Sequence, residues 1–277
     1  MLAETAYGKS SVRLVQVSRH GDRDDLKDFT VAIRFKGEYD QSYTDGDNRD
    51  VLPTDTMKNT VYALAARHPV EEPEAFGRLL AEHFLERNPR LRRVRIDLTE
   101  HQWGRIAVNA REHGQAFVRH GTESRTATVQ GKGDQFTIGA GVSDLVILKS
   151  SHSAFSGFLR DEYTTLPDVA DRILATALTA TWRYRTADLD FNLTWRAVRT
   201  TLLEAFAEHD SRSVQHTLHD MGRAVLDNVD AVTGVRLVMP NKHHLPVDLS
   251  LLGLENRNEI FVPTDEPYGL IEATILR

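Results

Sequence analysis

Residues 76–98 and 221–237 carry one pattern twice, and this repetition decides the fold. The first stretch reads FGRLLAEHFLERNPRLRRVRIDL, in which Phe76-Gly77-Arg78 opens a helical pattern that leads to Val94-Arg95-Ile96. The second reads MGRAVLDNVDAVTGVRL, in which Met221-Gly222-Arg223 leads to Val235-Arg236-Leu237 four residues sooner. Because only two copies fit, a short-period solenoid is excluded. The sequence predicts two related units in tandem.

Strand patterns precede and follow a pair of helical patterns in the first half of the chain. Val31, Ile33 and Phe35 alternate with polar residues, and residues 12–17 are rich in β-branched side chains, which predicts two strands. The full set expected here is strands over 12–17, 30–35, 94–98 and 105–110, with helices over 57–67 and 73–86. This order is β-β-α-α-β-β.

The second half repeats this order with less regular spacing. We expect strands over 126–131, 135–140, 144–149, 181–194 and 235–239, and helices over 167–174, 195–208 and 214–229. Gly131-Lys132-Gly133 reads as a hairpin turn rather than a phosphate loop, because no helix follows it. The prediction is an α+β protein whose antiparallel sheets carry helices on one face, with one unit over 1–140 and another over 141–277.

Composition narrows the class of protein. The 277 residues include 34 Lys and Arg against 40 Asp and Glu, a net charge of −6 that argues against a nucleic-acid partner. No apolar run reaches the roughly 18 residues needed to cross a membrane. The absence of cysteine removes thiol nucleophiles, thiolate metal sites and disulfides. We therefore expect a globular, cytoplasmic protein without a signal peptide at its start.

Two polar segments could carry chemistry. The first, 54–60 (TDTMKNT), stands at a helix start, where a Thr or Asp oxygen commonly caps free amides, although the same amides also attract anions. The second, Asn241-Lys242-His243-His244, follows a strand that we expect to end at Pro240. It reads either as a solvated loop or as a proton-transfer site, because histidine titrates near neutral pH. Both interpretations stay open for each segment.

A third segment, residues 148–166, combines aromatic, hydroxyl and charged side chains in an expected loop. Phe155 and Phe158 fit core packing, and Arg160 beside Asp161 fits a structural ion pair.

His216 and His219 lie three residues apart on a helix, but no further ligand at a recognisable spacing completes a metal site. We expect no metal there.

Six strings follow one another in an order typical of one enzyme family. They are 7–9 (YGK), 54–60 (TDTMKNT), 153–166 (SAFSGFLRDEYTTL), 171–174 (DRIL), 213–215 (SVQ) and 241–243 (NKH). Together they resemble the urate oxidase (uricase) family over Tyr7 to Leu270. The resemblance implies the tunnelling fold (T-fold), in which each chain has two β-β-α-α-β-β units and four chains form a β-barrel tunnel. It also implies cofactor-free oxidation of urate by O2 and water to 5-hydroxyisourate and H2O2, with no metal.

The resemblance assigns roles to residues of this sequence. Arg172, Gln215 and the Val214 backbone would hold one edge of urate, with Phe155 stacked on its ring. Thr54 and the Asp55 backbone amide would hold the opposite edge from a neighbouring subunit. Asn241 would hold oxygen above the ring. The remaining role is proton relay, which the resemblance gives to Lys9, Thr54 and His243.

Two features depart from the family pattern, and one alternative function stays open. Ser156 stands where relatives can have a bulky aromatic residue, and His244 follows the relay candidate His243. The end Ile275-Leu276-Arg277 differs from a Ser-Lys-Leu peroxisomal address, which favours a bacterial cytoplasm.

The alternative to a urate oxidase is a non-catalytic purine- or pterin-binding T-fold protein. A zinc-dependent pterin or GTP enzyme is a weaker rival, because its cysteine-bearing metal site is impossible here.

Overall fold

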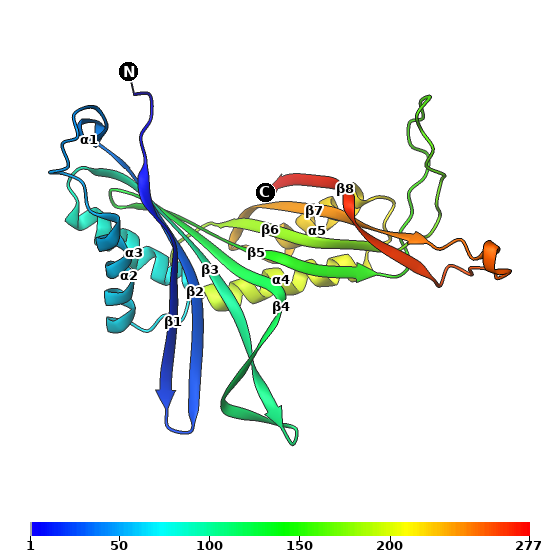
Figure 1. Ribbon diagram of the computed structural model, residues 1–277, viewed down its shortest axis with the longest axis horizontal. Helices are drawn as coiled ribbons and strands as arrows, with labels where there is room; N and C mark the ends of the chain where they lie inside the picture. The colour runs from blue at the N-terminus through cyan, green and yellow to red at the C-terminus, as the bar shows by residue number, and fades with distance from the viewer. Residues whose placement is uncertain (1) are drawn as a thin grey trace. The chain divides into compact units, whose positions relative to one another are not determined.

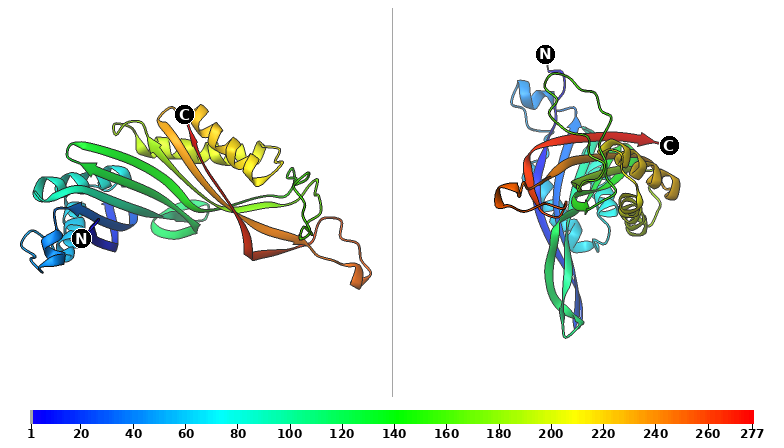
Figure 2. Two further views of the ribbon diagram at one scale, coloured as in Figure 1. Left: turned by 90° about the horizontal axis from the view of Figure 1, so that it is seen from above. Right: turned by 90° about the vertical axis from the view of Figure 1, so that its right-hand side faces the viewer.

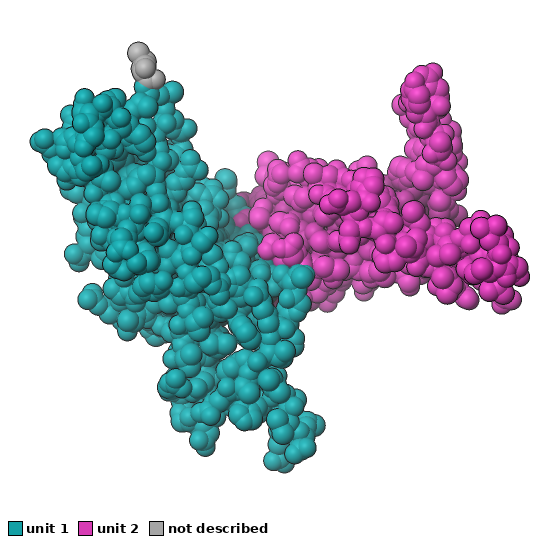
Figure 3. Space-filling view, in the orientation of Figure 1, with its two compact units in different colours: residues 1–141, 183–195 teal, residues 142–182, 196–277 magenta. Residues whose placement is uncertain are grey.

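The strands of the sheet lie in the order in which they occur along the chain. The computed structural model describes residues 2–277, and its strands form one eight-stranded sheet in the order β1 to β8 (Figure 1). The chain divides into two compact units (Figure 3). Unit 1 comprises Met1–Gly141 and Arg183–Trp195, and unit 2 comprises Val142–Trp182 and Arg196–Arg277. The boundary at residue 140 between sequence repeats stays a prediction.

Unit 1 contains four complete strands and three helices. They are β1 (Tyr7–His20), β2 (Arg23–Gly37), α1 (Asp40–Thr44), α2 (Thr54–Arg67), α3 (Pro73–Arg87), β3 (Leu91–Val108) and β4 (Arg111–Lys132). Neighbouring strands are antiparallel, and β5 (Gln135–Lys149) passes from unit 1 into unit 2. The short turn between β4 and β5 confirms the predicted glycine hairpin.

Unit 2 is built from the later strands and two helices. They are β6 (Leu174–Tyr184), α4 (Phe191–Glu208), α5 (Val214–Asn228), β7 (Val232–Pro246), the 3-10 helix η1 (Ser250–Leu252) and β8 (Phe261–Leu276). The last two residues of β6 and the first turn of α4 belong to unit 1. Within unit 2, α4 and α5 lie together on one face of the strands (Figure 2).

Each unit brings a helix onto its sheet at a glycine of the sequence repeat. A Cβ atom on Gly77 of α3 would lie 2.8 Å from Leu98 Cδ1 and 2.9 Å from Val129 Cγ2. A Cβ atom on Gly222 of α5 would lie only 2.6 Å from Ile275 Cδ1. A Cβ atom at either position would require a neighbouring side chain to shift, so glycine lets each helix lie close against its sheet. The repeat therefore marks where helix meets sheet, and the expected α+β class is confirmed.

Apolar faces fill the space at these contacts. In unit 1 the alternate residues Phe29, Val31, Ile33 and Phe35 of β2 are almost completely buried, as the alternation predicts. In unit 2 the core is formed by side chains from β6, α4, α5 and β7, among them Leu178, Leu202, Met221, Val225, Val235 and Leu237.

The second half shows where sequence patterns fail. Residues 167–174, all described, form a loop rather than the predicted helix, because Val169 pairs with Phe155 and Leu174 begins β6. The strand predicted over 181–194 is wrong, since β6 ends at Tyr184 and α4 begins at Phe191. Apolar runs of this length fit a strand or a helix equally, and packing decides between them.

Several predicted strands are fragments of longer ones. Residues 94–98 and 105–110 fall in or beside β3, and 135–140 and 144–149 are one strand, β5, in which Asp144 has a φ of 55°. The stretch 126–131 belongs to β4 of unit 1 rather than to the second half. Neither α1 nor β8 was predicted from the periodicity of the sequence.

A buried ion pair links three elements of unit 1. Arg125 of β4 donates to Glu74 of α3 at 2.7 Å, and the Tyr184 hydroxyl donates to the same carboxylate at 3.1 Å. Glu74 is 0% exposed, and burial raises the pKa of its carboxyl group although Arg125 opposes this. Arg125 also lies 5.3 Å from the centre of the Trp195 ring.

We expect Arg125→Met to lower the free energy of unfolding by about 3–5 kcal/mol, because it leaves a carboxylate buried without its cation. Arg223→Met is the matched control, since Arg223 forms an exposed pair with Asp227 at 2.9 Å on α5. The control should cost at most about 0.5 kcal/mol. Urea unfolding of both variants measures the difference, and equal losses would contradict the prediction.

Candidate functional site

Lys9 lies on β1 at an irregularity of the strand. The pairing of β1 with β2 shifts register between Lys9, which faces Ile33, and Val12, which faces Val31. Ser11 within this bulge has a φ of 57°. A bulge of this kind redirects side chains near functional sites. The Lys9 charge also contributes to lowering the pKa of the Asp55 carboxyl group, so Lys9 lies near the start of α2.

The start of α2 leaves backbone amides available. Pro53 occupies the N-cap position without a side-chain cap, and the first helical bond joins Met57 N to Pro53 O at 3.2 Å. The amides of Thr54 and Asp55 precede that bond, and free amides at a helix start attract anions. Within residues 2–277 the Thr54 hydroxyl makes no hydrogen bond, so the interpretation of Thr54 as a cap is wrong.

The Asp55 side chain is engaged elsewhere. It contacts Lys58 and accepts from Asn59 at 3.0 Å, and these contacts, Lys58 first, lower the pKa of its carboxyl group. Only the backbone amide of Asp55 therefore remains for a ligand, as the resemblance implies. Lys9, Thr54 and Asp55 together form the part of the candidate site that lies in unit 1.

Backbone hydrogen bonds bring Phe155 and Arg172 together within the loop between β5 and β6. Figure 1 shows this long loop of unit 2. Phe155 N donates to Val169 O at 2.8 Å, and Val169 N donates back at 2.9 Å. Arg172 N donates to Ser153 O at 2.7 Å. The Arg172 guanidinium carbon then lies 5.2 Å from the centre of the Phe155 ring, within the range of a cation–π contact.

Arg172 is a cation without an anion. Its Nε atom is buried and has no hydrogen-bond partner among the described residues. Burial lowers the pKa of this guanidinium, which nevertheless stays charged at any ordinary pH. A buried N–H donor without an acceptor is unfavourable unless something else accepts its hydrogen bond. The geometry therefore favours a planar anionic ligand beside Phe155.

The start of α5 joins the same cluster through Ser211. Ala154 N donates to Ser211 O at 2.7 Å, and Ser211 Oγ donates to Ser213 O at 3.1 Å. Ser213 caps α5, and the next two residues are buried Val214 and exposed Gln215. These bonds connect the loop that carries Phe155 and Arg172 to the segment just before Val214 and Gln215.

Asn241 and His243 lie on β7, which corrects the sequence prediction. We expected a loop after Pro240, but β7 continues to Pro246 because β8 pairs with it: Asn241 faces Gly269 and His243 faces Thr264. A register shift separates these two pairs. In the described chain neither side chain bonds to Phe155 or Arg172.

Ser153 is a site residue that sequence reasoning missed. It is 1% exposed, its carbonyl holds Arg172, and its amide donates to Asp171 Oδ1 at 3.2 Å. Its own Oγ is buried without a partner in the described chain. Ser153 begins the string 153–166, from which only Phe155 was assigned a role. Phe158 of that string stacks on Phe155 with ring centres 4.8 Å apart.

Other places that could bind ligands lie apart from these residues. The described chain holds no group of three or more His, Asp and Glu side chains arranged for a metal ion. None of the helices within residues 2–277 is both long and apolar enough to cross a membrane.

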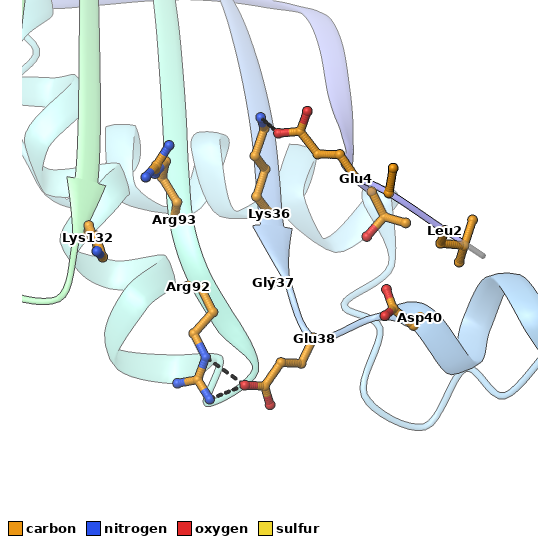
Figure 4. Close-up of a pocket in the computed structure, with 11 residues that line it drawn as sticks. Leu2, Glu4, Lys36, Gly37, Glu38, Asp40, Arg92, Arg93 and Lys132 are labelled. Carbon is orange, nitrogen blue, oxygen red and sulfur yellow. Dashed lines mark hydrogen bonds and ion pairs between the residues drawn. The ribbon is translucent and has the colours of Figure 1, made fainter.

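A hollow of about 360 Å³ in unit 1 is lined by Glu4, Lys36, Glu38, Arg92, Arg93 and Lys132 (Figure 4). Glu4 pairs with Lys36 and Glu38 pairs with Arg92, so both of these cations are already neutralised.

Known proteins resemble this chain along almost its whole length. A family model described as uricase matches residues 5–130 and 138–272. The uricase of Arthrobacter globiformis is 43% identical over 277 residues, which cover 100% of this chain and 90% of that protein. The uricase of Aspergillus flavus is 37% identical over 291 residues and covers 98% of this chain and 95% of its own.

Solved structures give the same result. The crystal structure of Arthrobacter globiformis uricase matches with a TM-score of 0.95 at 43% identity, over 100% of this chain and 95% of that one. A Bacillus sp. TB-90 urate oxidase matches with a TM-score of 0.84 at 23% identity, over 99% of both chains, and shows the fold alone. The T-fold class is confirmed. The chain belongs to the uricase family.

Proposed function

We propose that this chain is a urate oxidase, which oxidises urate with O2 and water to 5-hydroxyisourate and H2O2 in urate degradation. The observation that carries the proposal is the Arg172 guanidinium beside the Phe155 ring, with its buried Nε unpaired among the described residues, in a chain of the uricase family. Urate at neutral pH is a flat monoanion. It therefore offers a negative charge that can pair with Arg172 and a planar surface on which Phe155 can stack.

Recognition divides between two sets of residues. The guanidinium of Arg172 gives a planar fork of donors, and the Gln215 amide gives both a donor and an acceptor. The Val214 backbone completes this edge, and Phe155 stacks on the ring. The opposite edge meets the Thr54 hydroxyl and the Asp55 amide at the start of α2, where the helix dipole favours negative charge.

Removal of a second proton from urate makes it electron-rich. Lys9, acting through the Thr54 hydroxyl, takes this proton as a general base. The resulting dianion passes electrons singly to O2. Asn241 holds the oxygen species, and His243 moves protons as O2 becomes H2O2 and water adds to the oxidised ring. One urate, one O2 and one water thus give one 5-hydroxyisourate and one H2O2.

The reaction needs no metal or organic cofactor in this proposal. The test is the loss of urate absorbance by chelator-treated protein, with O2 uptake recorded in parallel. We expect one O2 consumed for each urate. Protein that stays inert until a metal ion is added back contradicts a cofactor-free reaction. Urate binding without any turnover instead supports the non-catalytic purine-binding alternative.

Lys9→Met tests the proton relay. We expect kcat to fall by about a hundredfold or more, because a positioned general base typically contributes this much. Urate binding measured without O2 should change by less than about threefold, since recognition rests on other residues. Lys36→Met on β2 is the control, because Lys36 pairs with Glu4 away from this site. Equal losses of turnover and binding would contradict the role of Lys9.

Arg172→Lys tests recognition. The variant keeps the positive charge but loses the planar fork, and charged hydrogen bonds of this kind contribute about 1.5–3 kcal/mol. We expect anaerobic urate binding to weaken by roughly tenfold or more, measured by calorimetry. Arg160→Lys, in the same loop but paired with Asp168 at 3.3 Å, should bind urate as the unchanged protein does. Unaltered binding by Arg172→Lys would refute the assignment.

We further propose that four copies of the chain close a β-barrel tunnel with each site shared between neighbours. The observation behind it is that β1 and β8 end the sheet and leave unpaired strand edges, which proteins usually cover. Light scattering should give four times the chain mass of 31.3 kDa. A fully active monomer would contradict the shared site.

A further inference from the structure

One hydrogen bond ties the loop before α2 to the strand that carries Lys9. Leu52 N donates to the Tyr7 hydroxyl oxygen at 3.1 Å. Leu52 lies two residues before Thr54, and Tyr7 lies two residues before Lys9. In the described chain this is the one hydrogen bond between residues 45–53 and β1. Both partners are partly buried, so the bond is shielded from water.

The Tyr7 ring is fixed independently of this bond. It packs edge-on against Phe35 with ring centres 5.7 Å apart, and against Tyr39 with ring centres 4.9 Å apart. Phe35 is completely buried and Tyr39 is 3% exposed, so the ring rests on rigid core. Edge-on aromatic pairs of this kind are stabilising. The hydroxyl group is therefore held in one place, and the loop is attached to it.

The other hydrogen bonds of the loop in the described chain do not reach β1: Asp47 N donates to Gln41 O of α1 at 3.2 Å. Residues 48–51 close a local turn through Val51 N and Asn48 O at 3.0 Å, and Asp50 pairs with Arg90 on the surface at 3.2 Å. Exposed ion pairs such as Asp50–Arg90 contribute little to stability. Pro53 then begins α2 without a side-chain cap. The chain immediately before Thr54 is thus held against β1 through Leu52, while the body of α2 is held by its buried residues Met57 and Val61.

We propose that Tyr7 is a positioning residue for the proton relay: its hydroxyl holds Leu52 so that the Thr54 hydroxyl stays within reach of the Lys9 amine. The inference rests on the proposed function, because it acts through Lys9 and Thr54. In this proposal Tyr7 acts only through the position of Leu52 and takes no proton itself. Burial raises the pKa of its phenol, so the hydroxyl stays neutral through the range of an enzyme assay.

Tyr7→Phe is the direct test, because it keeps the ring and its packing and removes only the hydroxyl. Tyr43→Phe is the matched control: the Tyr43 hydroxyl donates to Ala6 O at 3.2 Å, beside the same strand but away from Leu52. We expect Tyr7→Phe to lower kcat by roughly fivefold to tenfold, the equivalent of one lost hydrogen bond. Anaerobic urate binding should stay within about twofold, and Tyr43→Phe should leave kcat within about twofold.

A double variant separates positioning from a general loss of stability. In the Lys9→Met background the Tyr7→Phe change should have no further effect on kcat, because the relay it positions is already gone. The thermal midpoints of Tyr7→Phe and Tyr43→Phe should fall alike. An equal kcat for these two variants, or a Tyr7→Phe loss that persists beside Lys9→Met, overturns the inference. Lys9→Met with unchanged kcat instead overturns the relay of the proposed function, and the inference falls with it.

Discussion

The structure depends on close contact between a helix and the sheet in each unit, at Gly77 and Gly222, where a Cβ atom would displace side chains of the strands. Direct contact lets the alternate apolar residues of the strands interlock with the helix, which supplies most of the buried surface. One face of each part of the sheet is then covered by helices. The ends of the strands and the loops between them are left to carry chemistry.

The candidate site uses these loops in two different ways. In unit 2, backbone bonds of the segment around Ser153 place a guanidinium over an aromatic ring and leave its Nε without a partner. The cost of such an unpaired buried group is tolerated where a ligand completes it. In unit 1, a strand bulge and an uncapped helix start present an amine, a hydroxyl and free amides. The groups to which the proposed function assigns charge recognition and proton transfer thus lie on separate elements.

Tertiary context also explains where the sequence patterns misled. Residues 167–174 contain enough apolar side chains for a helix, yet the bonds between Val169 and Phe155 hold them as a loop. Pro240 signals the end of a strand, yet β7 continues because β8, unrecognised from periodicity, pairs with residues 241–246. In both cases a segment distant in sequence supplies the hydrogen-bond partners. Local sequence patterns do not indicate such distant partners.

The sequence by itself determined the family, the two-unit α+β class and the identity of the candidate site residues, because short motifs and glycine positions are local properties of the chain. Only the tertiary structure decided that Arg172 Nε is unpaired, that Thr54 is no cap, and that Tyr7 holds Leu52. Those facts depend on distances between residues far apart along the chain. Burial and hydrogen bonding arise from the folded arrangement, and no single segment specifies them.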